Sequence, residues 1–272
     1  MKPINDAELA AFSQLMFAAA GISLAPSKKA LVSGRLQRRL DALGMASFTQ
    51  YLANLQRDAG ERQRAIDLLT TNETYFFREP KHFAFLSEKI LPRINADRPF
   101  RVWSAACSSG EEPYSIAMVL AERLGNRPWE ILASDISTRV LEQAQTGIYP
   151  IERAEHIPKP YLKAYCLKGV GNHFGKFSID PALRRHTHFR SINLNTSLPE
   201  IGEFDLVFLR NVMIYFNADV KKQVCARLVQ VLRPDGFLFV GHSESLNGLD
   251  CPVTMVQPAI YRAGARAESA HR

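Results

Sequence analysis

Four short apolar runs in the second part of the chain constrain the fold more than any other feature. They are FRVWSAAC, WEILASDI, FDLVFLRN and GFLFVGHSE, which begin at Phe100, Trp129, Phe204 and Gly236. Between them, apolar residues recur at the three- and four-residue spacing of a helix. Strands that alternate with helices form a mostly parallel, doubly wound sheet. The sequence therefore predicts an α/β domain over residues 100–272.

The first 79 residues show helical spacing and no strand-like alternation. Breaks in the pattern fall at Gly21, at Gly44 and at the turn of residues 58–60. The sequence predicts an all-helical N-terminal domain over residues 1–79. A linker helix over residues 80–99 then leads into the sheet, and its prolines end it.

Residues 150–190 interrupt the alternation of strands and helices. They contain four of the fifteen prolines, three glycines and the short alternating piece KFSI. They also hold eight Lys and Arg against three Asp and Glu, a net charge of +5. The sequence predicts a small antiparallel β insert with a basic surface.

The overall composition excludes several classes of protein. Lys and Arg exceed Asp and Glu by seven, which suits an anionic partner but is too small an excess to indicate nucleic acid. No apolar run reaches the length of a membrane span, so no direct membrane insertion is predicted. The four cysteines show no CxxC pair and no zinc-site spacing with histidine. We expect reduced thiols, a cytoplasmic protein and no bound metal.

The loop after the first apolar run resembles a nucleotide-binding turn but carries the wrong charge for phosphate. It has the sequence AACSSGEE, with one glycine followed by Glu111 and Glu112. Because the carboxyl ends of parallel strands face one crevice, this loop should contact a ligand there. Two carboxylates favour hydroxyl groups or positive charge over pyrophosphate. Alternatively, they only stabilise the start of a helix through its dipole.

The second apolar run carries an acid, Asp135, at its end. An acid at the end of the second strand of such sheets accepts hydrogen bonds from a ribose diol. Alternatively, Ser134 or Asp135 is a simple helix cap. Together with the acidic turn, Asp135 indicates a ribose-bearing ligand without phosphate at the first turn. S-adenosylmethionine fits, since it combines a ribose with an ammonium group and a sulfonium.

The third run continues as LRNVMIYF, which places Arg210, Asn211 and Tyr215 beside the crevice. An arginine can hold a carboxylate through two parallel hydrogen bonds. Enzymes that methylate the exocyclic amino groups of bases carry two prolines and an aromatic residue at this point of the fold. LRNVMIYF lacks both prolines, which argues against a nucleic-acid substrate.

A polar segment, LLTTNETYFFREP, stands at the end of the helical region. It places Asn72, Thr74 and Arg78 just before the linker. Two readings are open: the segment caps a helix and docks the linker, or it folds over the crevice and closes the ligand site.

Taken together, the motifs resemble the chemotaxis receptor methyltransferase family, CheR. The matching stretches are TTNETYFFRE, RVWSAACSSGEEPYSIAM, ASDIS, INL, FLRNVMIYF and LRPDGFLFVGHSES, in this order between residues 66 and 245. The resemblance implies a helical domain followed by a Rossmann-like methyltransferase domain. It also implies methyl transfer from S-adenosylmethionine to glutamates of chemoreceptors in chemotaxis signalling, with S-adenosylhomocysteine as the product.

The resemblance assigns site residues to positions in each motif. Those implied to bind the cofactor are Asn72, Thr74, Arg78, Glu112, Asp135, Asn193, Leu194, Leu209 and Arg210. Tyr215 matches a tyrosine near the transferred methyl group. We expect Tyr215 and Arg78 to position the substrate carboxylate or to flank the sulfonium. A protein that only senses the cofactor or scaffolds partners is the alternative, and it would be expected to have lost such residues.

A basic stretch early in the chain is the expected docking site for the receptor. Between residues 28 and 39 it has no acid and contains Lys28, Lys29, Arg35, Arg38 and Arg39. Such a stripe is often only a solvated helix face, but the resemblance favours contact with an acidic receptor helix. The resemblance also implies that the β insert can bind the C-terminal peptide of a receptor as an added strand.

Overall fold

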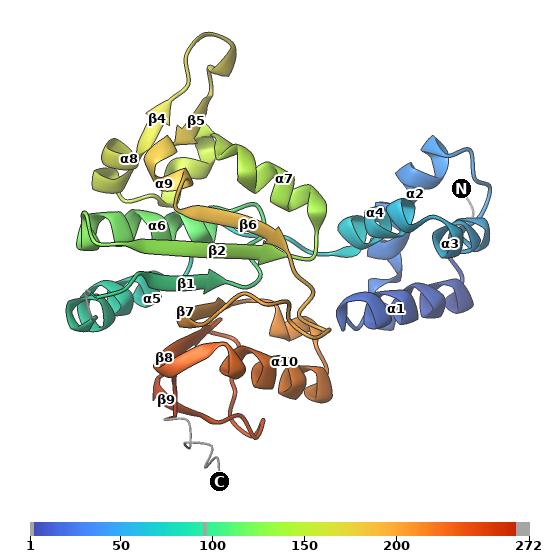
Figure 1. Ribbon diagram of the computed structural model, residues 1–272. Coiled ribbons are helices and arrows are strands. Elements are labelled where there is room, and N and C mark those ends of the chain that lie inside the picture. The colour runs from blue at the N-terminus through green and yellow to red at the C-terminus, as the bar shows by residue number, and fades with distance from the viewer. Residues whose placement is uncertain (1–2, 95–96, 265–272) are drawn as a thin grey trace.

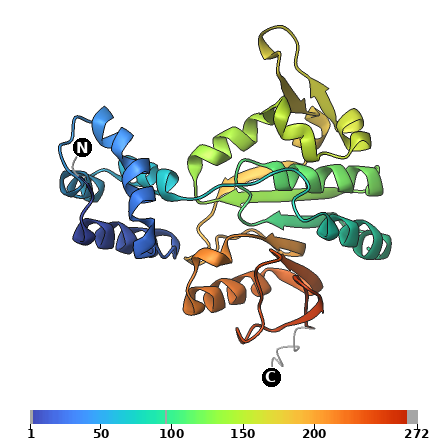
Figure 2. The same ribbon diagram turned by 180° about the vertical axis from the view of Figure 1, so that it is seen from behind.

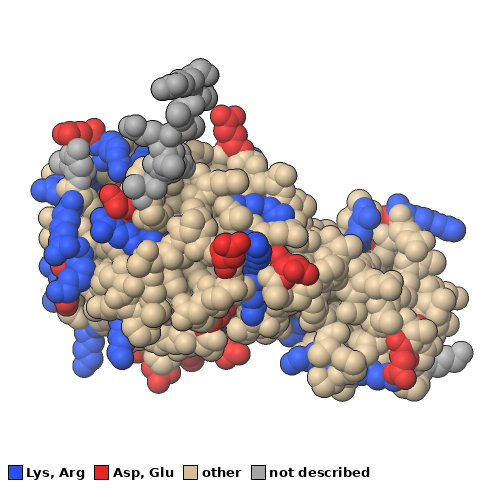
Figure 3. Space-filling model, turned by 90° about the horizontal axis from the view of Figure 1, so that it is seen from below, with Lys and Arg blue, Asp and Glu red and all other residues tan. Residues whose placement is uncertain are grey.

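The computed structural model describes residues 3–94 and 97–264 and divides into two lobes (Figure 1). The smaller lobe is helical and comes from the N-terminal part of the chain, and the larger lobe is built on a central sheet. In the view from below, a narrower waist joins them (Figure 3). Within the described ranges, no helix is both long and apolar enough to cross a membrane.

Local signals in the sequence set the helices of the smaller lobe. Asn5 and Glu8 form a reciprocal capping box at the first helix, and Gly21 ends that helix with a φ of 70°. The side chains of Ser47 and Asp58 cap the third and fourth helices. The elements are α1 (Asp6–Ala20), η1 (Pro26–Lys28), α2 (Lys29–Ala42), α3 (Phe48–Arg57) and α4 (Ala59–Leu69).

The helical lobe ends earlier than the sequence pattern predicts. Its last helix stops at Leu69, and residues 70–79 run toward the sheet without forming a helix. The carbonyl groups of this segment accept hydrogen bonds from the larger lobe instead, as those of Asn72 and Thr74 do. The linker that follows is helical and consists of α5 (Pro80–Phe85), the π-helical turn η2 (Leu86–Ile90) and the 3-10 turn η3 (Leu91–Arg93).

The larger lobe contains a seven-stranded sheet in the order β6-β2-β1-β7-β8-β10-β9. The strands from β6 to β8 are parallel, whereas β10 and β9 pair antiparallel at one edge. The four apolar runs form β1, β2, β7 and β8, which confirms the predicted mostly parallel sheet. The strands are β1 (Phe100–Ser104), β2 (Trp129–Asp135), β6 (Thr187–Ser191), β7 (Phe204–Leu209), β8 (Leu232–Val240), β9 (Val253–Gln257) and β10 (Ile260–Ala263).

Alternate residues of the central strands face two separate cores. Val102 and Leu206 pack in one apolar cluster with residues of α6 (Glu111–Leu124), and Trp103 and Val207 pack in another with residues of α10 (Ala218–Gln230). A third helix, α7 (Thr138–Thr146), follows β2. In Figure 1 the arrows of β1 and β2 point toward the helical lobe. The carboxyl ends of the parallel strands therefore face that lobe.

The predicted insert forms a second, three-stranded antiparallel sheet in the order β3-β5-β4, which confirms an antiparallel insert, although its last residues form β6 of the central sheet. The hairpin between β4 and β5 projects from the body, as both ribbon views show (Figures 1 and 2). The elements of this region are β3 (Ile148–Pro150), η4 (Ile151–His156), α8 (Lys159–Tyr165), β4 (Cys166–Lys168), η5 (Gly171–His173), β5 (Lys176–Ile179) and α9 (Pro181–Arg184).

The expectation of four reduced thiols is wrong for two of them. Cys225 of α10 and Cys251 of the loop after β8 form a disulfide, with their Cα atoms 6.3 Å apart. Cys107 and Cys166 are free. The pair is separated by 26 residues, so no local spacing indicates it, and only the packing of the loop against α10 brings the sulfur atoms together.

Candidate functional site

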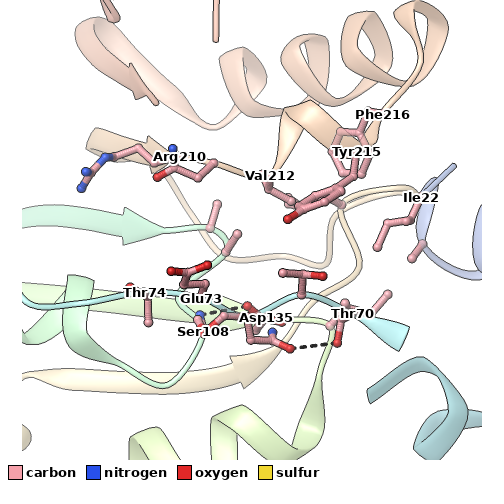
Figure 4. Close-up of a pocket in the computed structure, with 18 of the residues that line it drawn as sticks. Ile22, Thr70, Glu73, Thr74, Ser108, Asp135, Arg210, Val212, Tyr215 and Phe216 are labelled. Atoms are coloured by element: carbon pink, nitrogen blue, oxygen red, sulfur yellow. Dashed lines mark hydrogen bonds between the residues drawn. The ribbon is translucent and has the colours of Figure 1, made fainter. Parts of the chain in front are cut away.

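A cavity lies where the two lobes meet, at the carboxyl ends of the parallel strands. Its volume is about 270 Å³, and residues of both lobes line it. Figure 4 shows Arg210 and Tyr215 approaching it from one side, with Asp135, Ser108 and Thr74 on the opposite side. This is the crevice that the strand-end motifs predict.

Asp135 stands at the end of β2 and lines the cavity. One carboxylate oxygen accepts a hydrogen bond from the backbone N–H of Ser137 at 3.0 Å, and the other accepts one from the backbone N–H of Ser108 at 2.9 Å. These bonds fix the orientation of the carboxylate, and each oxygen keeps capacity to accept from a ligand hydroxyl. Burial raises the pKa of Asp135, while the backbone donors act in the opposite direction.

The two acids after the glycine turn lie in different surroundings. Glu112 lines the cavity and accepts a hydrogen bond from the Ser104 hydroxyl at 2.7 Å. Glu111 is fully buried, accepts a hydrogen bond from Ser109 at 2.7 Å and pairs with Arg153 of the insert at 3.3 Å. Burial raises the pKa of both carboxyl groups. Glu112 is thus part of the cavity wall, whereas Glu111 binds Arg153 and holds the insert in place.

Arg210 follows β7 and is almost completely buried. Its guanidinium group donates to Glu112 at 3.0 Å, to Glu79 at 3.2 Å and to the backbone carbonyl of Arg78. The sequence suggests an arginine that holds a ligand carboxylate. Instead, two protein carboxylates take up its donors, so Arg210 fixes the position of Glu112 in the cavity wall.

Glu79 is a residue of this site that sequence reasoning missed. Burial alone would raise its pKa, but the charge of Arg210 and surrounding hydrogen-bond donors lower it. Ligand atoms of Glu79, His82 and His242 lie within 4.8 Å of one another, a grouping that could hold a metal ion. We assign no metal to it, because Arg210 already pairs with the Glu79 carboxylate. Burial lowers the pKa of His82 to about 3, so this ring is neutral near pH 7.

Residues 70–79 form one wall of the cavity. The carbonyl of Asn72 accepts a hydrogen bond from the Ser108 hydroxyl at 2.8 Å, and the carbonyl of Thr74 accepts one from Arg153, also at 2.8 Å. The structure therefore supports the reading in which this polar segment folds over the crevice. The predicted site residues that it contributes to the lining are Asn72, Thr74 and Arg78.

Asn193, Leu194 and Tyr215 also line the cavity, next to the end of α1. The side-chain amide of Asn193 donates to the carbonyl of Ala19 at 2.6 Å. The backbone N–H of Ser23 donates to the carbonyl of Tyr215 at 3.0 Å. These bonds connect the cavity wall directly to the helical lobe.

Leu209 is the one predicted cofactor-binding residue that does not line the cavity. It is 1% exposed and packs in the apolar cluster that contains residues of α10. Successive side chains of a strand point to opposite faces. This alternation turns Leu209 into the core, while Arg210 reaches the cavity.

Backbone strain is concentrated around the cavity. A positive φ is costly for residues other than glycine and persists where the surroundings enforce it, often at functional sites. The segments that form the cavity walls contain Phe77 (φ 55°), Glu79 (φ 59°), Ser108 (φ 48°) and Asn211 (φ 59°). Gly110 has a φ of 97°, and an added Cβ there would lie 2.8 Å from the Tyr149 hydroxyl, so this turn requires glycine.

The predicted docking stretch is only partly available to a partner. Three of its basic side chains bond within the helical lobe: Lys29 with Asp6 at 2.6 Å, Arg39 with Glu61 at 2.5 Å, and Arg35 with the carbonyl of Thr70 at 2.9 Å. Lys28 reaches the lining of the ligand cavity. Arg38 remains exposed on α2.

Arg38 shares a groove at the junction of the lobes with Arg64 of α4 and Arg139 of α7. All three side chains are exposed. Among the residues that the structure describes, no acid lies within ion-pair distance of any of them. We call these three residues the arginine groove. Sequence reasoning missed Arg64 and Arg139, because they are far from Arg38 along the chain.

Comparison with known proteins places the chain in a family. The model described as CheR methyltransferase, SAM binding domain, matches residues 72–261, and the CheR methyltransferase all-alpha domain matches residues 7–70. Chemotaxis protein methyltransferase 2 of Pseudomonas aeruginosa is 46% identical over 89% of this chain and 87% of its own length. The chemotaxis protein methyltransferases of Escherichia coli and Borreliella burgdorferi are 42% and 39% identical, each over 95% of this chain and over 91% and 95% of their own lengths.

The cavity suits the ligand that these models name. Asp135 is held with free acceptor capacity at the strand end that binds ribose in such sheets, and the Glu112 carboxylate is available to a positively charged group. No glycine-rich phosphate turn competes with this reading. The chain belongs to the CheR family of methyltransferases, and S-adenosylmethionine is its cofactor.

Proposed function

We propose that this protein methylates glutamate side chains in the cytoplasmic domains of chemoreceptors, for adaptation in chemotaxis signalling. The products would be glutamyl methyl esters and S-adenosylhomocysteine, and the reaction would take place in the cytoplasm. The observation that carries the proposal is the chemistry of the cavity. Among the described residues that line it, there is neither a histidine nor a cysteine to act as a general base or a nucleophile.

A carboxylate substrate needs neither of these groups. A glutamate side chain has an ordinary pKa of about 4.3 and is already ionised at neutral pH. When bound, S-adenosylmethionine supplies an electrophilic methyl group on a positively charged sulfonium. The protein then needs only to align the two partners and to exclude water, and alignment can contribute roughly 7 to 11 kcal/mol.

We assign these tasks to the residues of the cavity wall. Asp135 accepts from the ribose hydroxyls, and Glu112, fixed by Arg210, binds the ammonium group. The segment of residues 70–79 limits access of water, which would solvate the separated ions more strongly than the neutralising transition state. Tyr215 and Arg78 position the incoming carboxylate. The remaining cofactor contacts are assigned to Asn72, Thr74, Asn193 and Leu194.

The β insert is proposed as a second contact with the receptor. Its strand β4 lies at the edge of the small sheet, and an edge strand can pair with an added peptide. Leu167, Val170 and Phe174, in β4 and the hairpin that follows it, are 51%, 76% and 82% exposed. These features support binding of the C-terminal peptide of a receptor.

The reaction can be tested with methyl-labelled S-adenosylmethionine and a receptor cytoplasmic fragment. We expect label in the fragment that mild alkali releases as methanol, since a carboxyl methyl ester is alkali-labile. Fragments with the acceptor glutamates replaced by alanine are the control and should release none. A fragment without its C-terminal peptide should be methylated more slowly if the insert binds that peptide. Tight cofactor binding without alkali-labile label on several receptors would favour a sensor or scaffold instead.

The arginine groove is the proposed docking site for acidic segments of the receptor. We expect the change of Arg38, Arg64 and Arg139 to glutamine to raise the KM for the receptor about tenfold, since exposed ion pairs contribute roughly 0.2 to 1 kcal/mol each. The kcat should stay within about twofold of the original value, because none of the three arginines lines the cavity. Rising salt should raise the KM for the receptor more in the original protein than in the variant, because salt screens exposed charges over about 8 Å at physiological ionic strength.

The matched control changes three other exposed cations, Arg57, Lys81 and Lys89, to glutamine. It removes the same total charge and should leave the KM for the receptor nearly unchanged. An equal rise in the KM for the receptor in both variants would show that only the net charge of the protein affects docking. Salt-independent methylation would contradict docking by charge.

A further inference from the structure

The helical lobe supplies the N-terminal cap of a helix in the other lobe. Helix α7 begins at Thr138, and its own preceding residue, Ser137, makes no capping bond through its side chain. Among the described residues, the buried Ser137 hydroxyl finds no hydrogen-bond partner. Instead, the carboxylate of Asp67 in α4 accepts from the backbone N–H of Thr138 at 3.0 Å and from its hydroxyl at 2.9 Å.

A second residue of α4 holds the same segment. The side-chain amide of Gln63 donates to the carbonyl of Ile136 at 2.9 Å and to Asp67 at 3.0 Å. Gln63 and Asp67 are four residues apart and therefore lie on the same side of α4. Together they bind the backbone of residues 136–138 on both sides of Ser137.

The segment that α4 holds follows directly from the cofactor site. Asp135 precedes Ile136, and its carboxylate accepts from the N–H of Ser137, which lies between the two groups that α4 binds. Asp67 is buried, with 7% of its surface exposed, so water competes weakly for its hydrogen bonds. A change in the position of α4 would therefore move the backbone donor that orients Asp135.

We infer that Asp67, supported by Gln63, is a positioning residue that sets the orientation of Asp135, so that the placement of the helical lobe controls the affinity for the cofactor. Asp67 itself does not line the ligand cavity. It acts through the cap of α7 and the N–H of Ser137. The inference rests on the proposed contact of Asp135 with the ribose.

The cap of α7 also lies next to the proposed docking surface. Asp67 and Thr138 line the same groove as Arg38, Arg64 and Arg139. A receptor segment in the arginine groove would contact the capped end of α7 from the outside. Binding of the receptor should therefore change the affinity for the cofactor, and the cofactor should change the affinity for the receptor by the same factor, since a coupling between two sites is reciprocal.

The test is a calorimetric titration with S-adenosylhomocysteine in the absence of a receptor. We expect Asp67→Ala to raise the Kd about five- to tenfold, as the loss of one or two buried hydrogen bonds would. Asp67→Asn keeps an acceptor oxygen for the Thr138 N–H and should restore the affinity to within about twofold. Asp41 is an exposed acid of the same lobe whose side chain bonds only to Gln37 among the described residues, so Asp41→Ala should bind the ligand as the original protein does.

A purely structural role for Asp67 predicts a different result in a second background. If Asp67 acts through Asp135, then Asp67→Ala should have little further effect on the Kd of an Asp135→Asn protein, because coupled changes are not additive. Two results would overturn the inference: an unchanged Kd in Asp67→Ala, or effects of Asp67→Ala and Asp135→Asn on the Kd that simply add in the double variant. Gln63→Met, which retains the side-chain length, provides the measurement if Asp67→Ala does not fold, and an unchanged Kd there would also overturn it. Since no methyl transfer is measured, failure of the proposed reaction would leave this result intact.

Discussion

Replacing Arg210 by methionine should abolish methyl transfer and destabilise the protein. The change leaves the carboxylates of Glu79 and Glu112 without the guanidinium group that bonds to both. Breaking a buried ion pair by removing one partner costs about 3 to 5 kcal/mol. Glu112 would lose its fixed position in the cavity wall, and the affinity for S-adenosylhomocysteine should fall by more than about tenfold, equivalent to about 1.4 kcal/mol.

The loss of stability in Arg210→Met should depend on pH in a defined direction. Arg210 contributes to lowering the pKa of Glu79, so the pair stabilises the fold above the unfolded pKa of a glutamate, and this contribution is lost as the pH falls. In the variant, both buried carboxyl groups would have raised pKa values and would be neutralised on mild acidification. Urea titrations should therefore show a larger difference between the two proteins at pH 7 than at pH 5.

Arg98→Met is the matched control for this prediction. Arg98 bonds to Asp205 through two nitrogen atoms but is 44% exposed at its side chain, and Asp205 keeps a second partner in Arg233. Its loss should cost no more than about 1 kcal/mol, as is usual for exposed pairs. If Arg210→Met were as stable as Arg98→Met and bound S-adenosylhomocysteine normally, then Arg210 would not fix Glu112 as described.

The elements of the fold that depend on local pattern could be predicted from the sequence. The four apolar runs became parallel strands. Glu112, at the start of the helix after β1, and Asp135, at the end of β2, face one cavity. This works because the strand period and the position of a loop at a strand end are local properties. The same period could have excluded Leu209, which immediately precedes Arg210 and therefore faces the opposite side.

Partners that are distant along the chain could not be predicted in this way. The basic stretch does not reveal that Arg39 pairs with Glu61, which lies two helices later. The cap of α7 by Asp67 spans 71 positions of the sequence, and no local motif indicates it. The charge run identified a basic surface, but only the packing of α2, α4 and α7 shows which arginines remain available.

Reducing the disulfide between Cys225 and Cys251 should lower the free energy of unfolding by about 3 to 4 kcal/mol. The bond closes a loop of 26 residues, and a loop of this length restricts the unfolded chain by roughly that amount in the chain-entropy model. Urea titrations with and without a thiol reductant measure the difference. The Cys225→Ser, Cys251→Ser double variant should unfold like the reduced protein and should not respond to the reductant.

The disulfide also holds the loop that supports the residues around Tyr215. Glu244 in this loop accepts from the backbone N–H groups of Asn211 at 2.8 Å and Ile214 at 3.3 Å. The ion pair of Lys222 with Asp250, at 2.9 Å, holds the same loop to α10, but both of its side chains are exposed, so it should compensate little for the lost bond. An unfolding midpoint that does not change with the reductant would show that the bond contributes nothing, and that the packing of the loop alone brings the two cysteines together.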